Sequence, residues 1–597
     1  MSVYKAPLRD LQFNLFELFD YEAHYQSLSG YEDVSAELVT TILNEFDKFC
    51  SNILSPLNAV GDKEGCTWSD GEVATPSGYK EAYRQYVEAG WPALANEPAY
   101  GGQGLPESLS IVLGEMRGTA NWSWGMYPGL SHGAVNTIEL HGTESQKQRF
   151  LTPLVEGTWT GTMCLTEAHC GTDLGLLRTK AEAAADGSYQ ITGTKIFISS
   201  GEHDLTENIV HIVLARLPDA PIGVKGISLF IIPKFNVNDD GSMGERNTVR
   251  CGSIEHKMGI HGNATCVMNF DGARGYLLGE PNQGLQAMFT FMNTARIGTA
   301  LQGIAHMELG YQKSLAYAKD RLQMRSVTGP KNPDGPADPI IVHPDVRRML
   351  LTQKALSEGG RMMVAYTGKL VDVIECTTDE VEKKSAEDML SFMTPIAKAF
   401  LTETGFESAN LALQCFGGHG YIKEWGVEQN VRDARIGMLY EGTTGIQALD
   451  FIGRKVLGSG GVLLQNFTRE IHHFCKENAE VAELQEFIEP LQALNKKWGE
   501  LTLHIGTKAM ENADEAGAAS VDYLMFSGYS CLAYFWAKAA SKARAALAAE
   551  NSEGEFYEAK LKTARFYYQR ILPRTSTCEA AILSGADNVM SLEVEAF

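Results

Sequence analysis

Residues 163–173 read M-C-L-T-E-A-H-C-G-T-D, an apolar run that passes directly into a turn rich in Gly, Thr and Asp. The apolar half is typical of a β-strand, and the Gly171-Thr172-Asp173 turn ends it. Backbone N–H groups and hydroxyls in such a turn can bind the polar edge of a ring or a phosphate. An ordinary strand end has the same pattern. The stretch therefore indicates a ligand site only if other stretches of the sequence also have ligand-binding patterns.

A second β-like stretch, T-K-I-F-I-S-S-G, occupies residues 194–201. Alternation along a strand places Phe197 and Ser199 on one face. An aromatic ring beside a hydroxyl suits a flat heterocyclic ligand, although a half-buried strand without a ligand fits equally well.

A glycine-rich stretch, Q-C-F-G-G-H-G-Y, ends a predicted long helix at residues 414–421. One glycine is enough for a helix C-cap. The additional glycines allow a ligand to approach the backbone closely.

A single acid, Glu441, stands in the stretch L-Y-E-G-T-T-G-I-Q at residues 439–447. Thr443 or Thr444 is the expected N-cap of the helix that follows. An acid before a helix often does no more than stabilise the helix dipole. The functional alternative places Glu441 at the mouth of an apolar cleft, where it would act as a general base.

The chain changes from helical to β-rich patterns and back. Helical spacing of apolar residues is found in residues 8–57, 80–88, 108–117, 144–155, 287–325, 343–373 and 386–415, and β-rich runs are found in 188–199, 209–217, 226–233 and 265–271. The charged stretch 377–388 predicts a solvated connection, and the Pro/Gly-rich stretch 328–339 an exposed loop.

These patterns predict an α+β, mostly α fold. We expect an N-terminal helical domain with an extension (1–157), a middle antiparallel β domain (158–283), a helical bundle (284–457) and an extra C-terminal helical domain (458–597).

Charge and cysteine content narrow the function classes. The 597 residues include 51 Lys and Arg against 74 Asp and Glu, which gives a net charge of −23 and disfavours nucleic acid and anionic membranes as partners. The chain contains no run of about 18 apolar residues, so no membrane span is predicted. The 11 cysteines show no C-x-x-C pair, which favours a reducing, cytoplasmic location.

Several common motifs are missing. The chain has neither G-x-G-x-x-G nor G-x-x-x-x-G-K-[ST], which argues against a Rossmann nicotinamide site and a P-loop. It has no H-E-x-x-H, and we expect no metal. One G-x-S-x-G pattern surrounds Ser131, but the Gly and Pro before it make a poor central strand for a serine hydrolase.

Taken together, the four stretches resemble the acyl-CoA dehydrogenase family, in order and spacing, within residues 93–457. They are similar to its [YM]-C-[LVI]-T-E-x-x-x-G-[ST]-D, K-x-[WFY]-I-[ST]-[NS]-G, Q-x-[FY]-G-G-x-G-[YF] and Y-E-G-T-x-x-I-Q motifs. Departures are Phe197 where Trp is common, and Ala168-His169 where Pro-Gly is usual. The N-terminal extension and C-terminal region resemble a long bacterial subgroup that includes the 3-(methylthio)propanoyl-CoA dehydrogenases.

The resemblance implies a role for each matching residue, with Glu441 as the catalytic base. The implied FAD-binding residues are Met163, Leu165, Thr166, Gly171, Thr172, Phe197, Ser199, Arg321, Gln323, Gln414, Gly417, Gly418 and Thr443. The implied substrate-binding residues are Thr172, Asn293, Arg296 and Gly442. In the family, the equivalents of Arg321, Gln323 and the Gln414 stretch reach the FAD of a neighbouring subunit, and extended members tend to be homodimers.

The implied reaction is the FAD-dependent conversion of an acyl-CoA to its trans-2-enoyl-CoA, with electrons passed to electron-transfer flavoprotein. The subgroup points to 3-(methylthio)propanoyl-CoA, an intermediate of dimethylsulfoniopropionate breakdown. A medium- or long-chain dehydrogenase of β-oxidation and an acyl-CoA oxidase are alternatives within the family. A flavin-binding scaffold without catalysis is an alternative from another class.

Overall fold

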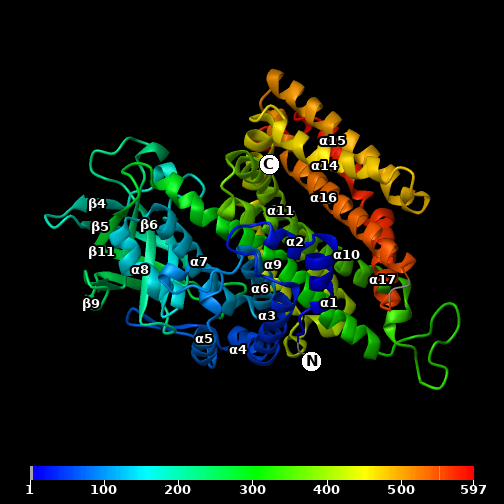
Figure 1. Cartoon of the computed structure of the whole chain (residues 1–597), viewed down its shortest axis with the longest axis horizontal. Coiled ribbons are helices and arrows are strands. Elements are labelled where there is room, and N and C mark those ends of the chain that lie inside the picture. Colours follow the sequence, from blue (N-terminus) through cyan, green and yellow to red (C-terminus); the bar gives the residue numbers. More distant parts are fainter. Residues whose placement is uncertain (1–3, 550–551) are drawn as a thin grey trace. The chain divides into compact units, whose positions relative to one another are not determined.

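The computed structural model describes residues 4–549 and 552–597 of the chain (Figure 1). These residues form two compact units. The sheet unit comprises residues 4–6 and 45–298, and the helical unit comprises residues 7–44 and 299–597. None of the helices in the described part of the chain has the length and apolar character needed to cross a bilayer.

The sheet unit contains a seven-stranded sheet in the order β3-β6-β7-β11-β5-β4, with β10 paired to β11. The strands are β3 (Trp159–Cys164), β4 (Lys180–Ala183), β5 (Tyr189–Ser199), β6 (Asn208–Ala215), β7 (Ser228–Pro233), β10 (Val249–Ile254) and β11 (Thr265–Leu278). The expectation of a purely antiparallel sheet is wrong at one place, because β3 and β6 run parallel. The chain forms β4 and β5 at the other edge of the sheet before it returns as β6 beside β3.

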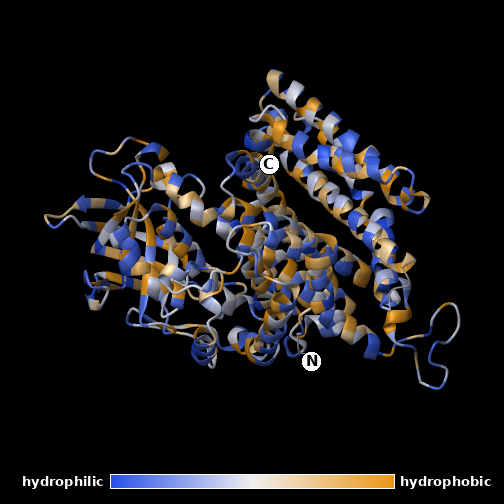
Figure 2. Cartoon of the chain, in the orientation of Figure 1, coloured by the Kyte–Doolittle hydropathy of each residue, from blue (hydrophilic) through white to orange (hydrophobic). Residues whose placement is uncertain are grey.

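The central strands β6 and β7 are buried along their whole length. In Figure 2, which colours residues by hydropathy, the strands of this unit carry both hydrophobic and hydrophilic residues. Alternate residues of β6 enter two different cores, Val210 and Ile212 on one face and Val213 and Ala215 on the other. A strand buried on both faces reads as a nearly continuous apolar run, and N-I-V-H-I-V-L-A departs from such a run only at Asn208 and His211.

Two helices, α7 (Trp122–His141) and α8 (Glu144–Glu156), pack on one face of this sheet, and its unit also has further helices and short hairpins. The further helices are α4 (Ser55–Glu64), α5 (Tyr79–Glu88) and α6 (Glu107–Ala120), and the hairpins pair β1 (Thr67–Ser69) with β2 (Glu72–Ala74) and β8 (Phe235–Val237) with β9 (Met243–Arg246). The helical spacing of apolar residues did not predict α7, which contains several glycines and Pro128. Packing overrides these weak helix formers, since a Cβ at Gly161 of β3 would lie 2.3 Å from the Cβ of Ala134 on α7.

The helical unit consists of long helices. Its elements are α1 (Leu8–Gln12), a π-helix (Phe13–Leu18), α2 (Tyr21–Gln26), α10 (Pro344–Cys376), α11 (Glu380–Cys415), α12 (Glu428–Arg435), α13 (Thr444–Leu449), a π-helix (Asp450–Leu457), α14 (Val462–Glu477), α15 (Gln485–Glu511), α16 (Asp514–Ala548), α17 (Gly554–Phe566), α18 (Arg574–Leu583) and α19 (Asp587–Met590). Two helices pass from one unit into the other, α3 (Ala36–Phe49) and α9 (Gly284–Asp320).

One predicted connection in the helical unit is wrong. The charged stretch 377–388 is helical from Glu380 onward, because Asp379 caps α11 by accepting the N–H groups of Val381 and Glu382. The acids of the first turn, Glu380 and Glu382, also stabilise the helix, because they lie near the positive end of its dipole. The Pro/Gly-rich stretch 328–339 is a loop, as predicted.

A buried ion cluster joins four elements of the helical unit. It contains three carboxylates and three cations, Asp10 of α1, Glu308 of α9, Lys354, Glu358 and Arg361 of α10, and Lys560 of α17. Burial alone would raise the pKa of Asp10, but Lys560 and Arg361 bring it down to about 2.

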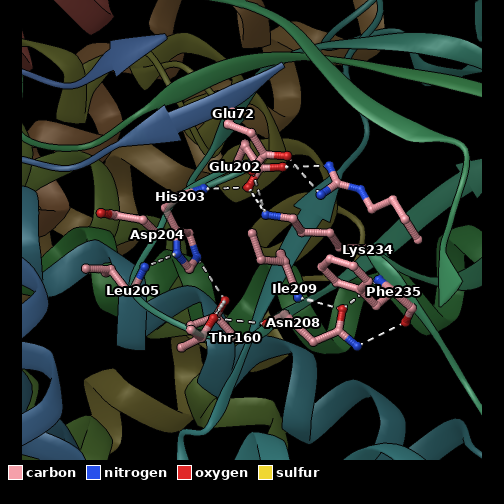
Figure 3. Close-up of polar contacts among 12 residues, drawn as sticks. Glu72, Thr160, Glu202, His203, Asp204, Leu205, Asn208, Ile209, Lys234 and Phe235 are labelled. Carbon is pink, nitrogen blue, oxygen red and sulfur yellow. Dashed lines mark hydrogen bonds and ion pairs between the residues drawn. The ribbon is translucent and has the colours of Figure 1, made fainter. Parts of the chain in front are cut away.

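The sheet unit has a charged cluster of its own, drawn in Figure 3. Nζ of Lys234, which is 6% exposed, contacts the carboxylates of Glu202 and Glu72, the second at 3.3 Å. The guanidinium of Arg246 reaches the same two carboxylates at 3.4 and 2.9 Å. The two cations neutralise the two carboxylates, which partly buried charges require. Because Glu72 lies on β2, its ion pairs with Lys234 and Arg246 also connect the β1–β2 hairpin to the sheet.

Two buried histidines of this unit are neutral. The N–H of Leu205 donates to Nδ1 of His203 at 3.2 Å, so the ring proton is on Nε2, which lies 2.9 Å from Oγ1 of Thr160. Burial, with the nearby charge of Lys234, lowers the pKa of His203 and of His211 to about 3.

Lowering the pH from 7 to 5 should therefore destabilise the sheet unit. In the unfolded chain these histidines bind protons below about pH 6.5, whereas in the folded chain they stay neutral to about pH 3. Unfolding then takes up protons across this window, so the free energy of unfolding falls as the pH decreases, by about 2 kcal/mol per histidine at pH 5. Urea unfolding of the wild type and of His203→Gln/His211→Gln at both pH values measures this. An equal pH dependence in the two proteins would contradict it.

Candidate active site

The predicted flavin turn begins where β3 ends at Cys164. The backbones of Glu167 and Cys170 exchange N–H···O=C bonds of 2.9 and 3.0 Å, which closes a tight turn. The carbonyl of Thr166 accepts the N–H of Ile196 at 2.9 Å, and this bond brings the turn beside β5. Met163 and Thr166 are half-buried, Leu165 is buried, and Gly171 and Thr172 are exposed.

Lys195 holds the residues on both sides of Thr166, one through its backbone carbonyl and the other through its carboxylate. Its fully buried Nζ donates to the carbonyl of Leu165 at 3.0 Å and to Oε1 of Glu167 at 2.8 Å. Burial would raise the pKa of Glu167, but the charge of Lys195 and several hydrogen bonds lower it to about 2. This lysine was not predicted from sequence to belong to the site, although a lysine among apolar strand residues indicates a buried, partnered charge.

A metal ion does not fit this turn, although Glu167, His169 and Cys170 lie close enough to share one. The carboxylate of Glu167 already accepts the N–H groups of Arg178 and Thr179, the hydroxyl of Thr179 and the ammonium of Lys195. These donors use its acceptor capacity, so the carboxylate serves as a structural anchor.

Phe197 lies in a β-bulge and is 59% exposed. Ile198 pairs with Cys266 and Lys195 with Met268, so two residues of β5 face one residue of β11. The φ angle of Phe197 is +59°, in a region that a large side chain rarely adopts. Such a bulge re-aims a side chain, and Ser199 on the same strand is half-buried. An exposed aromatic ring with hydroxyls nearby fits the isoalloxazine of a flavin.

The predicted substrate residues Asn293 and Arg296 lie together on α9. Nη1 of Arg296 is 3.5 Å from Oδ1 of Asn293, and the two residues are one helical turn apart. A guanidinium beside an amide can bind a phosphate or a carbonyl of a large anionic ligand.

Glu441 belongs to the helical unit and lies in a loop between a 3₁₀ turn and α13. It is half-buried, and its φ angle of +56° places a non-glycine residue in the left-handed region. Gly442 follows with φ +91°, where a Cβ would lie 2.6 Å from Nε2 of Gln447. Thr443 caps α13 by accepting the N–H of Ile446 at 3.3 Å, which confirms one of the two predicted caps.

Two other side chains hold this loop. Nζ of Lys398 on α11 donates to the carbonyls of Gly437 at 2.8 Å and of Gly442 at 2.5 Å. Nε2 of Gln447 donates to the carbonyl of Glu441 itself at 2.9 Å. Neither residue was predicted from sequence to belong to the site.

The remaining predicted cofactor residues form two exposed groups in the helical unit. Arg321 and Gln323 follow the end of α9, with Nη2 and Oε1 3.5 Å apart. Gln414, Gly417 and Gly418 lie at the end of α11, and a Cβ at either glycine would meet no atom within 4 Å. This open backbone fits the approach of a nucleotide.

Family models match most of the chain. Those for the N-terminal, middle and C-terminal domains of acyl-CoA dehydrogenases match residues 41–158, 162–273 and 282–457. A fourth, described as acetyl-CoA dehydrogenase C-terminal like, matches residues 467–593. The predicted fold class, with helical, β and helical domains followed by an extra helical domain, is confirmed.

Relatives that align over nearly the whole chain are also named as acyl-CoA dehydrogenases. The 3-methylmercaptopropionyl-CoA dehydrogenase of Ruegeria pomeroyi is 41% identical, over 98% of this chain and 99% of its own. The broad-specificity linear acyl-CoA dehydrogenase FadE5 of Mycobacterium tuberculosis is 34% identical, over 100% of both chains. An acyl-CoA dehydrogenase from Bacillus anthracis, solved with FAD, shares the fold with a TM-score of 0.73 at 20% identity, over 94% of this chain and 90% of its own.

Proposed function

Because the chain belongs to the acyl-CoA dehydrogenase family, and is thus an FAD-dependent oxidoreductase, we propose that Glu441 is its catalytic base. The carboxylate would remove the α-proton of an acyl-CoA while a hydride leaves the β-carbon, so that the product is a trans-2-enoyl-CoA. The observation that carries this proposal is the restrained left-handed backbone of Glu441 in its glycine-flanked loop. A strained non-glycine residue persists only where its surroundings hold it, often at a functional site.

FAD, when bound, supplies the hydride acceptor of this reaction. In the sheet unit, the exposed Phe197 and the turn around Thr166 would hold its ring system. In the helical unit, Thr443, the Arg321–Gln323 pair and the open glycines at the end of α11 would contact the rest of the cofactor. The other contacts expected from sequence, those of Met163, Leu165, Gly171, Thr172 and Ser199, belong to the same proposal.

The proposed substrate is 3-(methylthio)propanoyl-CoA. The name of the Ruegeria relative, with its 41% identity over nearly the whole chain, supports this choice. The Mycobacterium relative supports the second candidate, a linear fatty acyl-CoA. Asn293, Arg296, Thr172 and Gly442 would bind the thioester and its CoA in both cases.

Anaerobic titration of the purified holoenzyme with a panel of acyl-CoAs tests this function. We expect 3-(methylthio)propanoyl-CoA to bleach the oxidised flavin, faster than butanoyl-CoA and octanoyl-CoA do. Faster bleaching by a linear fatty acyl-CoA would select the second candidate, and no bleaching by any of them would refute the dehydrogenase function. Rapid peroxide formation in air without an acceptor protein would instead identify an oxidase.

We further propose that electrons pass to electron-transfer flavoprotein, and that the enzyme is a cytoplasmic homodimer. The exposed Arg321, Gln323 and Gln414 are available to a neighbouring subunit, which supports the dimer. All 11 cysteines are free thiols, which supports a reducing compartment.

A further inference from the structure

Lys398 is a fully buried lysine on α11, within the apolar stretch T-P-I-A-K-A-F-L. An ammonium group in such surroundings is costly unless its hydrogen bonds are made. Its Nζ makes them with the carbonyl oxygens of Gly437 and Gly442, at 2.8 and 2.5 Å. Bonds from a charged donor are about twice as strong as bonds between neutral groups.

These two carbonyls bracket the segment that contains Glu441. Gly437 lies in the 3₁₀ turn before the loop, and Gly442 directly follows Glu441. A single cation therefore ties together the two ends of a short segment. Inside this segment, Nε2 of Gln447 holds the carbonyl of Glu441 at 2.9 Å.

The backbone of Glu441 needs such a restraint. Its φ of +56° is unfavourable for a residue with a Cβ, so an unrestrained loop would relax toward negative φ. That rotation would turn the side chain of Glu441 in another direction, because the side chain is attached to the Cα about which the backbone rotates.

We propose that Lys398 is a positioning residue that fixes the direction of the Glu441 carboxylate by clamping the backbone at both ends of its loop. The inference rests on the proposed role of Glu441 as the base. A misplacement of about 1 Å at a reacting group costs about 100-fold in rate. Loss of the clamp should therefore reduce the rate of proton abstraction while FAD and acyl-CoA still bind.

The test compares Lys398→Met, which keeps an unbranched side chain one atom shorter and removes its donors, with Lys369→Met. Lys369, on α10 of the same unit, also donates to a backbone carbonyl, that of Phe19 at 2.8 Å, and lies outside the proposed site. Stopped-flow mixing of each holoenzyme with saturating acyl-CoA gives the rate of flavin reduction. FAD content and the Kd of the acyl-CoA are measured on the same samples.

A thioester with sulfur in place of its β-carbon isolates the proton step, because it can lose the α-proton but no β-hydride. Its enolate above oxidised flavin should give a long-wavelength charge-transfer band. We expect Lys398→Met to lose about 100-fold in reduction rate and most of this band, with FAD content and Kd within about twofold of wild type. Lys369→Met should match wild type in all four measurements.

Other outcomes separate the clamp from the function itself. If wild type bleaches and Lys398→Met reduces its flavin at the wild-type rate, the clamp is refuted and the proposed function stands. If acyl-CoA does not bleach the flavin of the wild type, the proposed function is refuted, and the proposed role of Lys398 is refuted with it. Should Lys398→Met not yield folded holoenzyme, Lys398→Arg and Lys398→Gln replace it. Arg, which keeps charge and donors, must then be faster than Gln, and equal rates would overturn the proposal.

Discussion

Glu441→Gln should bind FAD and acyl-CoA as the wild type does and reduce its flavin about 10⁴-fold more slowly, since general-base catalysis contributes up to about that factor. The amide is close to the carboxylate in shape but cannot accept the α-proton. The bond from Gln447 and the second bond from Lys398 go to the main-chain carbonyls of Glu441 and Gly442, so the substitution leaves them in place.

Single-turnover reduction by acyl-CoA, followed anaerobically by flavin absorbance, measures this loss. Glu403→Gln is the matched control. Oε1 of Glu403 accepts the hydroxyl of Thr444 at 2.6 Å, and a glutamine there keeps an acceptor oxygen. The control should stay within about twofold of wild type, as expected of substitutions that leave the chemistry untouched. A Glu441→Gln enzyme within tenfold of the wild-type rate would remove this residue from the role of base.

The local character of the site could be predicted from sequence wherever it depends on neighbouring residues. The cap at Thr443 follows from cap chemistry alone. A turn after the strand follows from turn chemistry, but the structure closes it between Glu167 and Cys170, before the predicted Gly171-Thr172-Asp173. The bulge at Phe197 could not be predicted. It depends on the register with Cys266 and Met268 of a distant strand, whereas strict alternation assumes a regular ladder.

The supporting lysines escaped prediction for a related reason. Lys195 and Lys398 each stand in an apolar run, which indicates a buried charge with a partner. The partners are main-chain carbonyls and, for Lys195, also the carboxylate of Glu167, all in segments distant in sequence, and no spacing rule identifies them. Helix α7 was not predicted for the opposite reason, because its glycines and Pro128 are weak helix formers and tertiary packing stabilises the helix.

Lys560→Met should lower the free energy of unfolding of the protein by about 3–5 kcal/mol, the usual cost of leaving buried carboxylates without their cation. Nζ of Lys560 is bonded to Asp10 and, at 2.7 Å, to Glu358. It comes from α17, and its partners come from α1 and α10, so its loss would loosen the N-terminal segment and the added helices together.

The exposed neighbour Lys562 provides the control for Lys560. Its Nζ pairs with Glu558 on the same helix at 2.9 Å, and its side chain is 70% exposed, so Lys562→Met should cost less than about 0.5 kcal/mol. Urea unfolding followed by far-ultraviolet circular dichroism compares the two variants. The destabilisation of Lys560→Met should shrink below pH 4. The folded wild type holds the pKa of Asp10 at about 2, below its usual value, so the unfolded chain binds a proton at Asp10 first and the cluster then contributes less to the stability of the wild type. If Lys560→Met and Lys562→Met lost the same free energy of unfolding, this cluster would not stabilise the C-terminal helices of residues 458–597. The stability of that region would then have to come from the apolar contacts of α16.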